Sequence, residues 1–261
     1  MTLRQTTREI IKFVEEISGI PVQVTEDPNL QTIAAVRMAR KGGLPQHLIV
    51  YKPEKGKAPD YEICFQCGYI IRLFQSAPEN QFDLTDTQKG RDEIEDMLRA
   101  PDGAAGRFRL KKSQIVELRD QFHSGLLVHL RSVPIGFYVS RWLTTSYPEF
   151  AEMQMRHVQK ESETNKQSLQ ANIQQITPPK VYNATLSISA AYAIFWADQY
   201  NKPEWVHPYH TKKFDITGHK LLDVYNKTPD DPNYDKTLIQ SWGEHLSIQS
   251  WFELAPNQSG I

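Results

Sequence analysis

The sequence predicts an α+β fold, in which a small N-terminal three-stranded sheet is followed by a mostly α-helical C-terminal region. Three short runs with strand character, at residues 21–25, 31–40 and 47–51, lie close together near the start of the chain. From Ser113 onward, apolar residues recur at three- and four-residue spacing, which is typical of amphipathic helices. The change of period along the chain therefore separates a mixed region from a helical one.

A boundary between the two regions is predicted at 101–106, where the chain reads Pro-Asp-Gly-Ala-Ala-Gly. This loop divides the chain into an α+β unit at residues 1–100 and a helical region at residues 101–261. The helical region either packs onto the first unit as one domain or stands apart from it, and the sequence leaves both arrangements open.

The composition is that of an ordinary soluble globular protein, with 39% hydrophobic and 23% charged residues. The formal net charge is -1 and the sequence pI is about 6.7. This balance gives no general reason to expect binding to nucleic acid or to a membrane. A local basic group at Arg107, Arg109, Lys111 and Lys112 fits a solvated surface better than a binding patch.

Membrane and targeting signals are not found in the sequence. No apolar run approaches the roughly 18 residues that a membrane-spanning helix needs, and the first residues lack the apolar core of a signal peptide. The two cysteines do not form a disulfide framework and favour a reducing compartment. We therefore predict a cytoplasmic protein that is not membrane-bound, with its oligomeric state left open.

The N-terminal elements follow from caps and turn residues. A first helix is expected from a cap at Thr6 or Thr7 to Gly19, which can end it. After the strands, with a Gly42-Gly43 turn before the third, Asp60 can cap a second helix at 61–74.

The remaining elements are predicted to be helices, apart from one loop. A polar helix at 83–100 is capped near Thr85 or Thr87, and helices over 113–142 are interrupted at Pro134. A long helix runs from Pro148 to about Ile176, and the most apolar helix follows at 181–200. An aromatic and histidine-rich loop at 201–213 then leads to helices at 215–226 and 235–252. The stretch 157–168 of the long helix carries one large apolar side chain, so we interpret it as a solvated arm.

The helix at 61–74 carries the most informative spacing in the chain. Phe65, Gln66, Gly68 and Tyr69 occupy the places of an H-E-x-G-H zinc helix. In that motif two His side chains hold zinc, and the Glu beside the first His is the general base.

The order helix, three strands and then this helix resembles the N-terminal part of the ImmA/IrrE family of zinc metallopeptidases, over about Thr6 to Leu98. In that family an edge strand that lies parallel to the substrate leads into the zinc helix. The run at 47–51 leads into the helix at 61–74 in a similar way. The resemblance implies a third ligand on the next helix, where Glu93 or Glu95 could stand. It also implies proteolytic relief of a transcriptional repressor, in stress response or on mobile elements.

The residues at the motif positions predict a site that has lost this chemistry. Phe65 has no lone pair for zinc, Gln66 has almost no basicity, and Tyr69 is a poor ligand unless ionised. We therefore expect no catalytic residue, no metal and no cofactor. The preferred hypothesis is a non-catalytic, zincin-like binding or regulatory protein that recognises a protein partner through a vestigial substrate cleft.

One alternative is a metallohydrolase with a non-standard metal site. Cys64 and Cys67 form a C-x-x-C that could supply two zinc ligands, with His207 and His210 as a distant second pair and His219 as a spare. A redox role for the same two cysteines is a further option, since Cys64 lies near a helix start. Burial of both cysteines in the core is the competing interpretation.

Another alternative is a nucleic-acid-binding module that uses the loop between Trp205 and Lys213. Aromatic rings beside basic groups could stack on bases and contact phosphates. The candidate residues are Trp205, His207, Tyr209, His210, Lys212 and Lys213. The competing interpretation is a loop pinned to the core by its own aromatic side chains.

Overall fold

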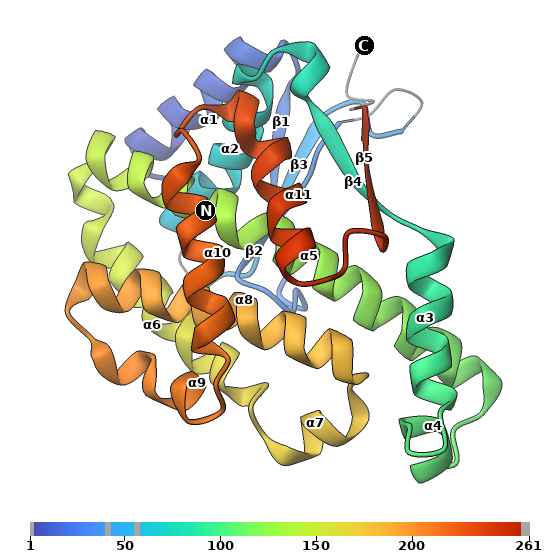
Figure 1. The fold of residues 1–261 in the computed structure, drawn as a ribbon. Coiled ribbons are helices and arrows are strands. Elements are labelled where there is room, and N and C mark those ends of the chain that lie inside the picture. Colours follow the sequence, from blue (N-terminus) through green and yellow to red (C-terminus); the bar gives the residue numbers. More distant parts are fainter. Residues whose placement is uncertain (1–2, 40–42, 55–57, 257–261) are drawn as a thin grey trace.

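The computed structural model describes residues 3–39, 43–54 and 58–256, and Figure 1 shows their arrangement. The α+β prediction is confirmed, because a three-stranded sheet lies near the N-terminus and helices dominate the rest of the described chain. Within these residues, no helix is both long enough and apolar enough to cross a membrane.

The N-terminal elements are helix α1 (Gln5–Ser18), strands β1 (Val22–Glu26), β2 (Ala34–Arg37) and β3 (His47–Tyr51), and helix α2 (Asp60–Gln75). The sheet has the order β1-β3-β2, with β1 parallel and β2 antiparallel to β3. Thus β3 is the central strand, and β2 is a shorter edge strand than the predicted run at 31–40. Gly42 of the predicted turn lies outside the described residues.

Helix α1 buries one face and ends for a reason that can be read locally. Ile10 and Val14 are fully buried on its inner face, and Gly19 ends it with a left-handed φ of 68°. The predicted cap at Thr6 or Thr7 is wrong, because the helix starts at Gln5 without a side-chain cap. The hydroxyl of Thr7 instead donates to Asp60 of α2.

A second, two-stranded sheet replaces parts of two predicted helices. Strand β4 (Phe82–Asp86) pairs antiparallel with β5 (Phe252–Pro256), so residues 83–86 and 252 are not helical. Helix α3 (Gln88–Arg99) starts after the strand, and Thr87 caps it by accepting a hydrogen bond from Gly90 N at 3.1 Å. Local patterning missed these strands because each one is completed by a partner far along the chain.

Helix α4 (Ala104–Arg107) is followed by α5 (Lys112–Ser146), the longest helix of the described chain. The predicted interruption at Pro134 is wrong, because α5 continues through it. Proline inside a helix costs about 3 kcal/mol relative to alanine. The buried residues around it, including Val133, Ile135 and Phe137, pack against the rest of the core, and this burial offsets the loss.

The other C-terminal elements are η2 (Pro148–Phe150), α6 (Ala151–Gln167), α7 (Ala171–Ile176), α8 (Pro179–Tyr200), η3 (Pro203–Trp205), α9 (His207–Thr211), α10 (Asp215–Lys227), η4 (Pro232–Tyr234) and α11 (Asp235–His245). The predicted long helix is therefore broken between α6 and α7, and the predicted last helix ends at His245. The predicted loop contains η3 and α9, each with a proline in its first turn, where the missing N–H is harmless.

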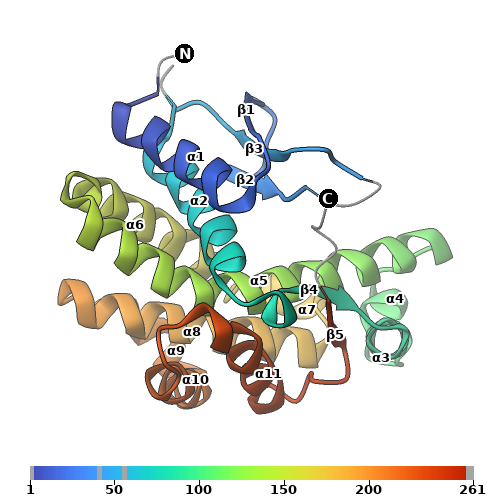
Figure 2. The ribbon, with the colours of Figure 1, turned by 90° about the horizontal axis from the view of Figure 1, so that it is seen from above.

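Helices α2 and α5 lie between the small sheet and the C-terminal helices. Seen from above, α1 and the three strands lie on one side, and α8, α10 and α11 lie on the other (Figure 2). One contiguous cluster of buried apolar side chains runs from Ile10 to Phe252. Both predicted regions therefore contribute to the same hydrophobic core.

Candidate binding site at helix α2 and strand β2

Helix α2 contacts α5 closely at two glycines. A Cβ atom on Gly68 would lie 2.3 Å from Val139 Cγ1. On α5, a Cβ atom on Gly136 would lie 2.9 Å from the Tyr69 hydroxyl and 3.1 Å from Phe65 Cζ. The two glycines thus allow the helices to approach. Helix packing alone accounts for the one residue of the zinc-helix pattern that this chain retains.

Phe65, at the place of the first His, belongs to an aromatic cluster. Its ring lies 6.0 Å from Tyr61, 5.2 Å from Tyr69 and 5.6 Å from the ring of His157 on α6, measured between centroids. His157 also approaches Glu62, with Nδ1 3.3 Å from Oε1. The first ligand position is therefore filled by packed rings rather than open to an ion.

Tyr69, at the place of the second His, is used as a hydrogen-bond donor. Its hydroxyl donates to the carbonyl of Ser132 on α5 at 2.7 Å. Burial raises the pKa of the Tyr69 phenol well above its ordinary value. A neutral phenol committed to a backbone carbonyl does not act as a zinc ligand.

Gln66, at the place of the general base, points to the sheet. Its Nε2 donates to the carbonyl of Ala34 on β2 at 3.4 Å. The side chain of Gln66 is half-buried. This position therefore lies beside the edge strand, with an amide in place of a base.

The start of α2 is tied to α1. Asp60 does not cap its own helix as predicted, since the N-cap residue is Pro59 and makes no side-chain bond. Instead the Asp60 carboxylate accepts from Arg4 N at 3.0 Å and from the Thr7 hydroxyl at 2.5 Å. This carboxylate fixes the N-terminal ends of the two helices to each other.

The candidates for a third zinc ligand are engaged elsewhere. Glu93 accepts from Trp251 Nε1 at 2.8 Å and from Lys180 at 3.1 Å. Glu95 pairs with Arg99 and Arg119. Both glutamates lie on α3, which packs against α5.

Cys64 and Cys67 lie in the core rather than at a reactive surface. Both side chains are fully buried, and burial raises the pKa of Cys64 to about 12 and that of Cys67 well above its ordinary value. His207 and His210 are exposed on α9. In the described part of the chain, no three His, Cys, Asp or Glu side chains come together in a way that could hold a metal ion.

The segment from Trp205 to Lys213 is anchored by its own rings. Trp205 and Tyr209 are buried, at 6% and 1% exposed, so neither ring can stack on a base. His210 Nδ1 lies 2.6 Å from Asp215, and Lys212 Nζ donates to the carbonyl of Leu169 at 2.7 Å. The stacking proposed for Trp205 and Tyr209 is therefore corrected: the two rings anchor the segment to the core.

The outer edge of β2 is a feature that the sequence did not reveal. Lys52 N bonds to Ile33 O at 2.8 Å, so alternate pairs along β2 and β3 exchange hydrogen bonds, and Ala34 and Val36 direct their backbone groups away from β3. Within residues 3–39, 43–54 and 58–256, the N–H and C=O of Val36 have no hydrogen-bond partner. The expectation that 47–51 is the edge strand is thus wrong, and β2 takes that place.

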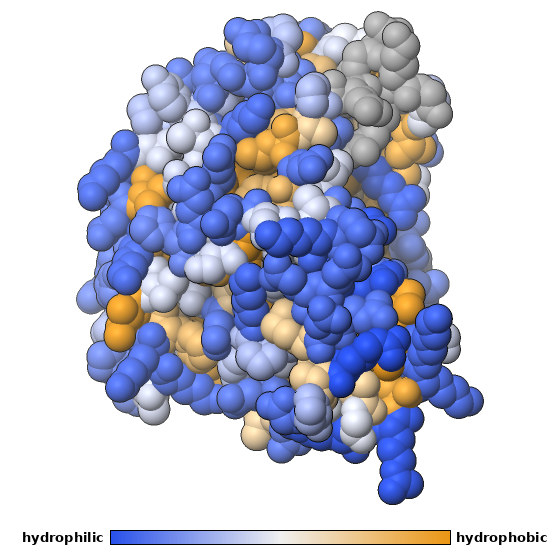
Figure 3. All heavy atoms as spheres, turned by 45° about the vertical axis from the view of Figure 1, so that its right-hand side comes forward, coloured by the Kyte–Doolittle hydropathy of each residue, from blue (hydrophilic) through white to orange (hydrophobic). Residues whose placement is uncertain are grey.

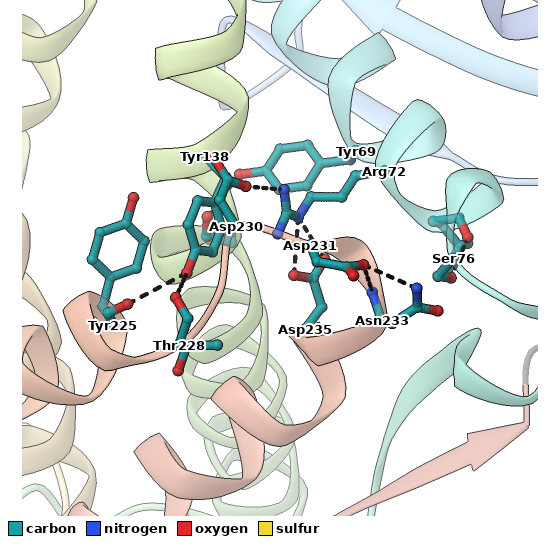
Figure 4. A network of polar contacts seen from close by, with 12 residues as sticks. Tyr69, Arg72, Ser76, Tyr138, Tyr225, Thr228, Asp230, Asp231, Asn233 and Asp235 are labelled. Carbon is teal, nitrogen blue, oxygen red and sulfur yellow. Dashed lines mark hydrogen bonds and ion pairs between the residues drawn. The ribbon is translucent and has the colours of Figure 1, made fainter.

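A buried ion-pair network joins α2 to the C-terminal helices (Figure 4). Arg72 Nε donates to both carboxylate oxygens of Asp235 at 2.9 and 2.8 Å, and its Nη1 donates to Asp230 at 2.7 Å. The guanidinium lies 4.1 Å from the ring centroid of Tyr138. In the sequence, Arg72 is a single charged residue within an apolar part of the helix. Such a residue indicates a buried ion pair, which the spacing argument did not consider.

The surface of the described residues carries isolated apolar side chains. Figure 3 shows one face, on which apolar residues are scattered among hydrophilic ones. The large hydrophobic residues that are exposed come from separate segments, namely Leu44, Phe108, Val128, Ile216 and Tyr234. Scattered residues of this kind do not form a docking patch.

Comparisons with known proteins do not add a relative. No protein-family model, curated protein or solved structure matches the chain.

Proposed function

We propose that the protein is a non-catalytic binding protein that takes up an extended segment of a protein partner along the free edge of β2. The observation that carries the proposal is the pair of outward-facing residues Ala34 and Val36, with the backbone of Val36 left unpaired in the described chain. An open strand edge is a ready template for pairing with another chain.

The side of the site that faces α2 supports binding rather than hydrolysis. Phe65 and Tyr69 are packed against α5, and Gln66 brings an amide to the edge strand. An amide can donate and accept hydrogen bonds but cannot take up a proton from water. Our proposal keeps the likeness to ImmA/IrrE peptidases, which is supported by the order of α1, the three strands and α2 and by the contact between Gln66 and β2.

The proposal is tested with Val36→Pro. Proline removes the outward N–H of Val36 and leaves the ladder to β3 intact, because that ladder uses the neighbouring residues. Peptides are selected from a random displayed library against the purified protein, and their affinities are measured by fluorescence polarisation. We expect Val36→Pro to weaken binding by at least about tenfold, the equivalent of about 1.4 kcal/mol.

The matched control is Val36→Thr, which changes the side chain and keeps the N–H. We expect it to bind the same peptides within about twofold, because main-chain bonds supply most of the affinity in this mode. Equal affinity of Val36→Pro and Val36→Thr for the selected peptides would disprove binding at this edge.

A further inference from the structure

Residues 159–177, which we call the strap, are held to the molecule by little buried surface. The strap comprises the end of α6, residues 168–170, α7 and Thr177, and Ser162 is its one buried residue. The earlier turns of α6 differ, since Phe150 just before the helix and Val158 within it are fully buried. The strap therefore starts where fully buried apolar side chains end.

The contact between the strap and α8 combines the half-buried side chain of Leu169, which packs against the cluster that includes Tyr182, with buried polar groups that are incompletely paired. On α6, Ser162 Oγ and Asn165 Nδ2 are buried without a hydrogen-bond partner among the described residues. On α8, the hydroxyl of Tyr182 is in the same condition. Buried polar groups are normally paired, and an unpaired group weakens the contact that buries it.

Space remains beneath the strap. A hollow of about 300 Å³ lies between α7 and the first turn of α8, and its lining includes Gln174, Thr177 and Tyr182. Helix α7 itself has no buried residue and lies at the lower edge of the molecule in Figure 1. Close packing, which makes a protein interior rigid, does not extend to this contact.

Exposed side chains from other elements hold the strap by its carbonyls. Lys212 Nζ donates to Leu169 O at 2.7 Å, and Arg107 Nη1 donates to Gln175 O at 3.4 Å. Both are solvent-exposed contacts, and such contacts are weak. At the far end, Pro178 and Pro179 fix the backbone φ angles at the start of α8. A rotation of the chain before them therefore does not disturb that helix.

We propose that the strap is a lid, which lifts from α8 as a unit while the rest of the protein stays folded. The lid turns about Gln159 and Pro178 and uncovers the first turn of α8 at Tyr182. Lys212 acts as its clasp. This device is independent of the binding proposed at β2.

Ser162→Cys tests the lid directly, because the protein contains its own reference thiols. Cys64 and Cys67 are fully buried in the core, so we expect them to react far more slowly than a thiol in a segment that opens locally. The variant is treated with iodoacetamide under native conditions, and modification is followed at each site by mass spectrometry. We expect Cys at 162 to react on the order of 100-fold faster than Cys64, since local openings are far more frequent than global ones. Equal rates at all three thiols would overturn the proposal.

The clasp is tested with a matched pair of neighbours. Lys212→Met removes the bond to Leu169, whereas Lys213→Met removes an exposed amine for which no contact is found in the described chain. In the Ser162→Cys background, we expect Lys212→Met to speed modification at 162 by at least about threefold and Lys213→Met to leave it unchanged. An unchanged rate in Lys212→Met, or an equal acceleration at Cys64, would overturn the proposal.

The unmodified protein supplies a second measurement that needs no variant. In native-state hydrogen exchange, the amides of 159–162, whose helical hydrogen bonds reach back across the hinge to 155–158, should exchange on the order of 100-fold faster than the buried amides of α8. Equal exchange of both helices would contradict the lid even if Ser162→Cys failed to fold.

Discussion

At the scale of single residues, the positions that match the zinc-helix pattern are explained by packing. Phe65 belongs to a cluster of rings, Tyr69 is bonded to a backbone carbonyl, and Gly68 lies against Val139. The contacts of Phe65 and Tyr69 would be disturbed by the histidines that zinc chemistry needs at those two places, whereas Gly68 is the residue that the pattern itself has. The packing of α2 on α5 therefore depends on side chains that do not bind zinc in this arrangement.

Gly68→Ala tests this interpretation. The added Cβ would lie 2.3 Å from Val139 Cγ1, so α2 and α5 must separate. We expect a loss of about 1–3 kcal/mol in the free energy of unfolding, measured by urea denaturation, which is the usual effect of overpacking a core.

Gly125→Ala on α5 is the matched control for that substitution. Gly125 is exposed and has no atom within 4 Å of an added Cβ. Alanine in a helix interior is favoured over glycine by about 1 kcal/mol, so this variant should be more stable than the parent. If Gly68→Ala were also stabilising, the close approach of the two helices would be refuted.

At the scale of elements, the sequence pattern predicts those helices and strands that are determined by neighbouring residues in the chain. The first helix, the three strands, α2 and α8 follow from apolar spacing and from turn residues such as Gly19. Strands β4 and β5 could not be found in this way, because each is stabilised by the other across the length of the chain. The edge position of β2 has the same origin, since sheet order depends on pairing and not on the pattern within one strand.

The candidate site was predicted in part. Spacing alone drew attention to Phe65, Gln66 and Tyr69, which the structure places on one helix beside β2 and α5. Spacing could not show that Trp205 and Tyr209 are buried, because an aromatic residue in a loop reads the same whether it anchors or binds. Only the contacts that the ring makes in the folded protein distinguish an anchoring residue from a binding one.

Arg72 is the polar link between α2 and the C-terminal elements, and its removal should be severe. In Arg72→Leu, the carboxylate of Asp235 remains buried without the guanidinium that donates to both its oxygens. Removing one partner of a buried ion pair costs about 3–5 kcal/mol. Urea denaturation should show a loss of this size, whereas Arg99→Leu, which breaks an exposed pair with Glu95, should lose less than about 1 kcal/mol.

The effect of Arg72→Leu should depend on pH, with a sign fixed by Asp235. Burial is the largest influence on Asp235 and raises its pKa, whereas Arg72 lowers it. Without Arg72 the folded-state pKa lies further above the unfolded value, so the variant loses stability as pH rises between the two. Its deficit relative to the parent should thus be smaller at about pH 4 than at about pH 8. A deficit that is constant with pH would show that the carboxylate is not left buried and charged.

At the scale of the whole molecule, the two predicted regions share their stabilising contacts. The core cluster includes residues from both, β4 receives its partner strand from the C-terminal end, and Arg72 pairs across the boundary. A unit ending near residue 100 would lack the partner of β4 and the carboxylates that neutralise Arg72. We therefore expect the loop at 101–106 to connect two parts of one cooperative structure.

The chain carries natural reporters that test this cooperativity. All five tryptophans follow residue 101, and both cysteines precede it. Tryptophan fluorescence therefore reports on the helical region, and protection of Cys64 and Cys67 from iodoacetamide reports on the first unit. Because the two regions share one core, we expect both signals to change at the same urea concentration, as two-state unfolding requires. Loss of thiol protection at a lower urea concentration than the fluorescence change would show instead that the α+β unit opens while the helices stay folded.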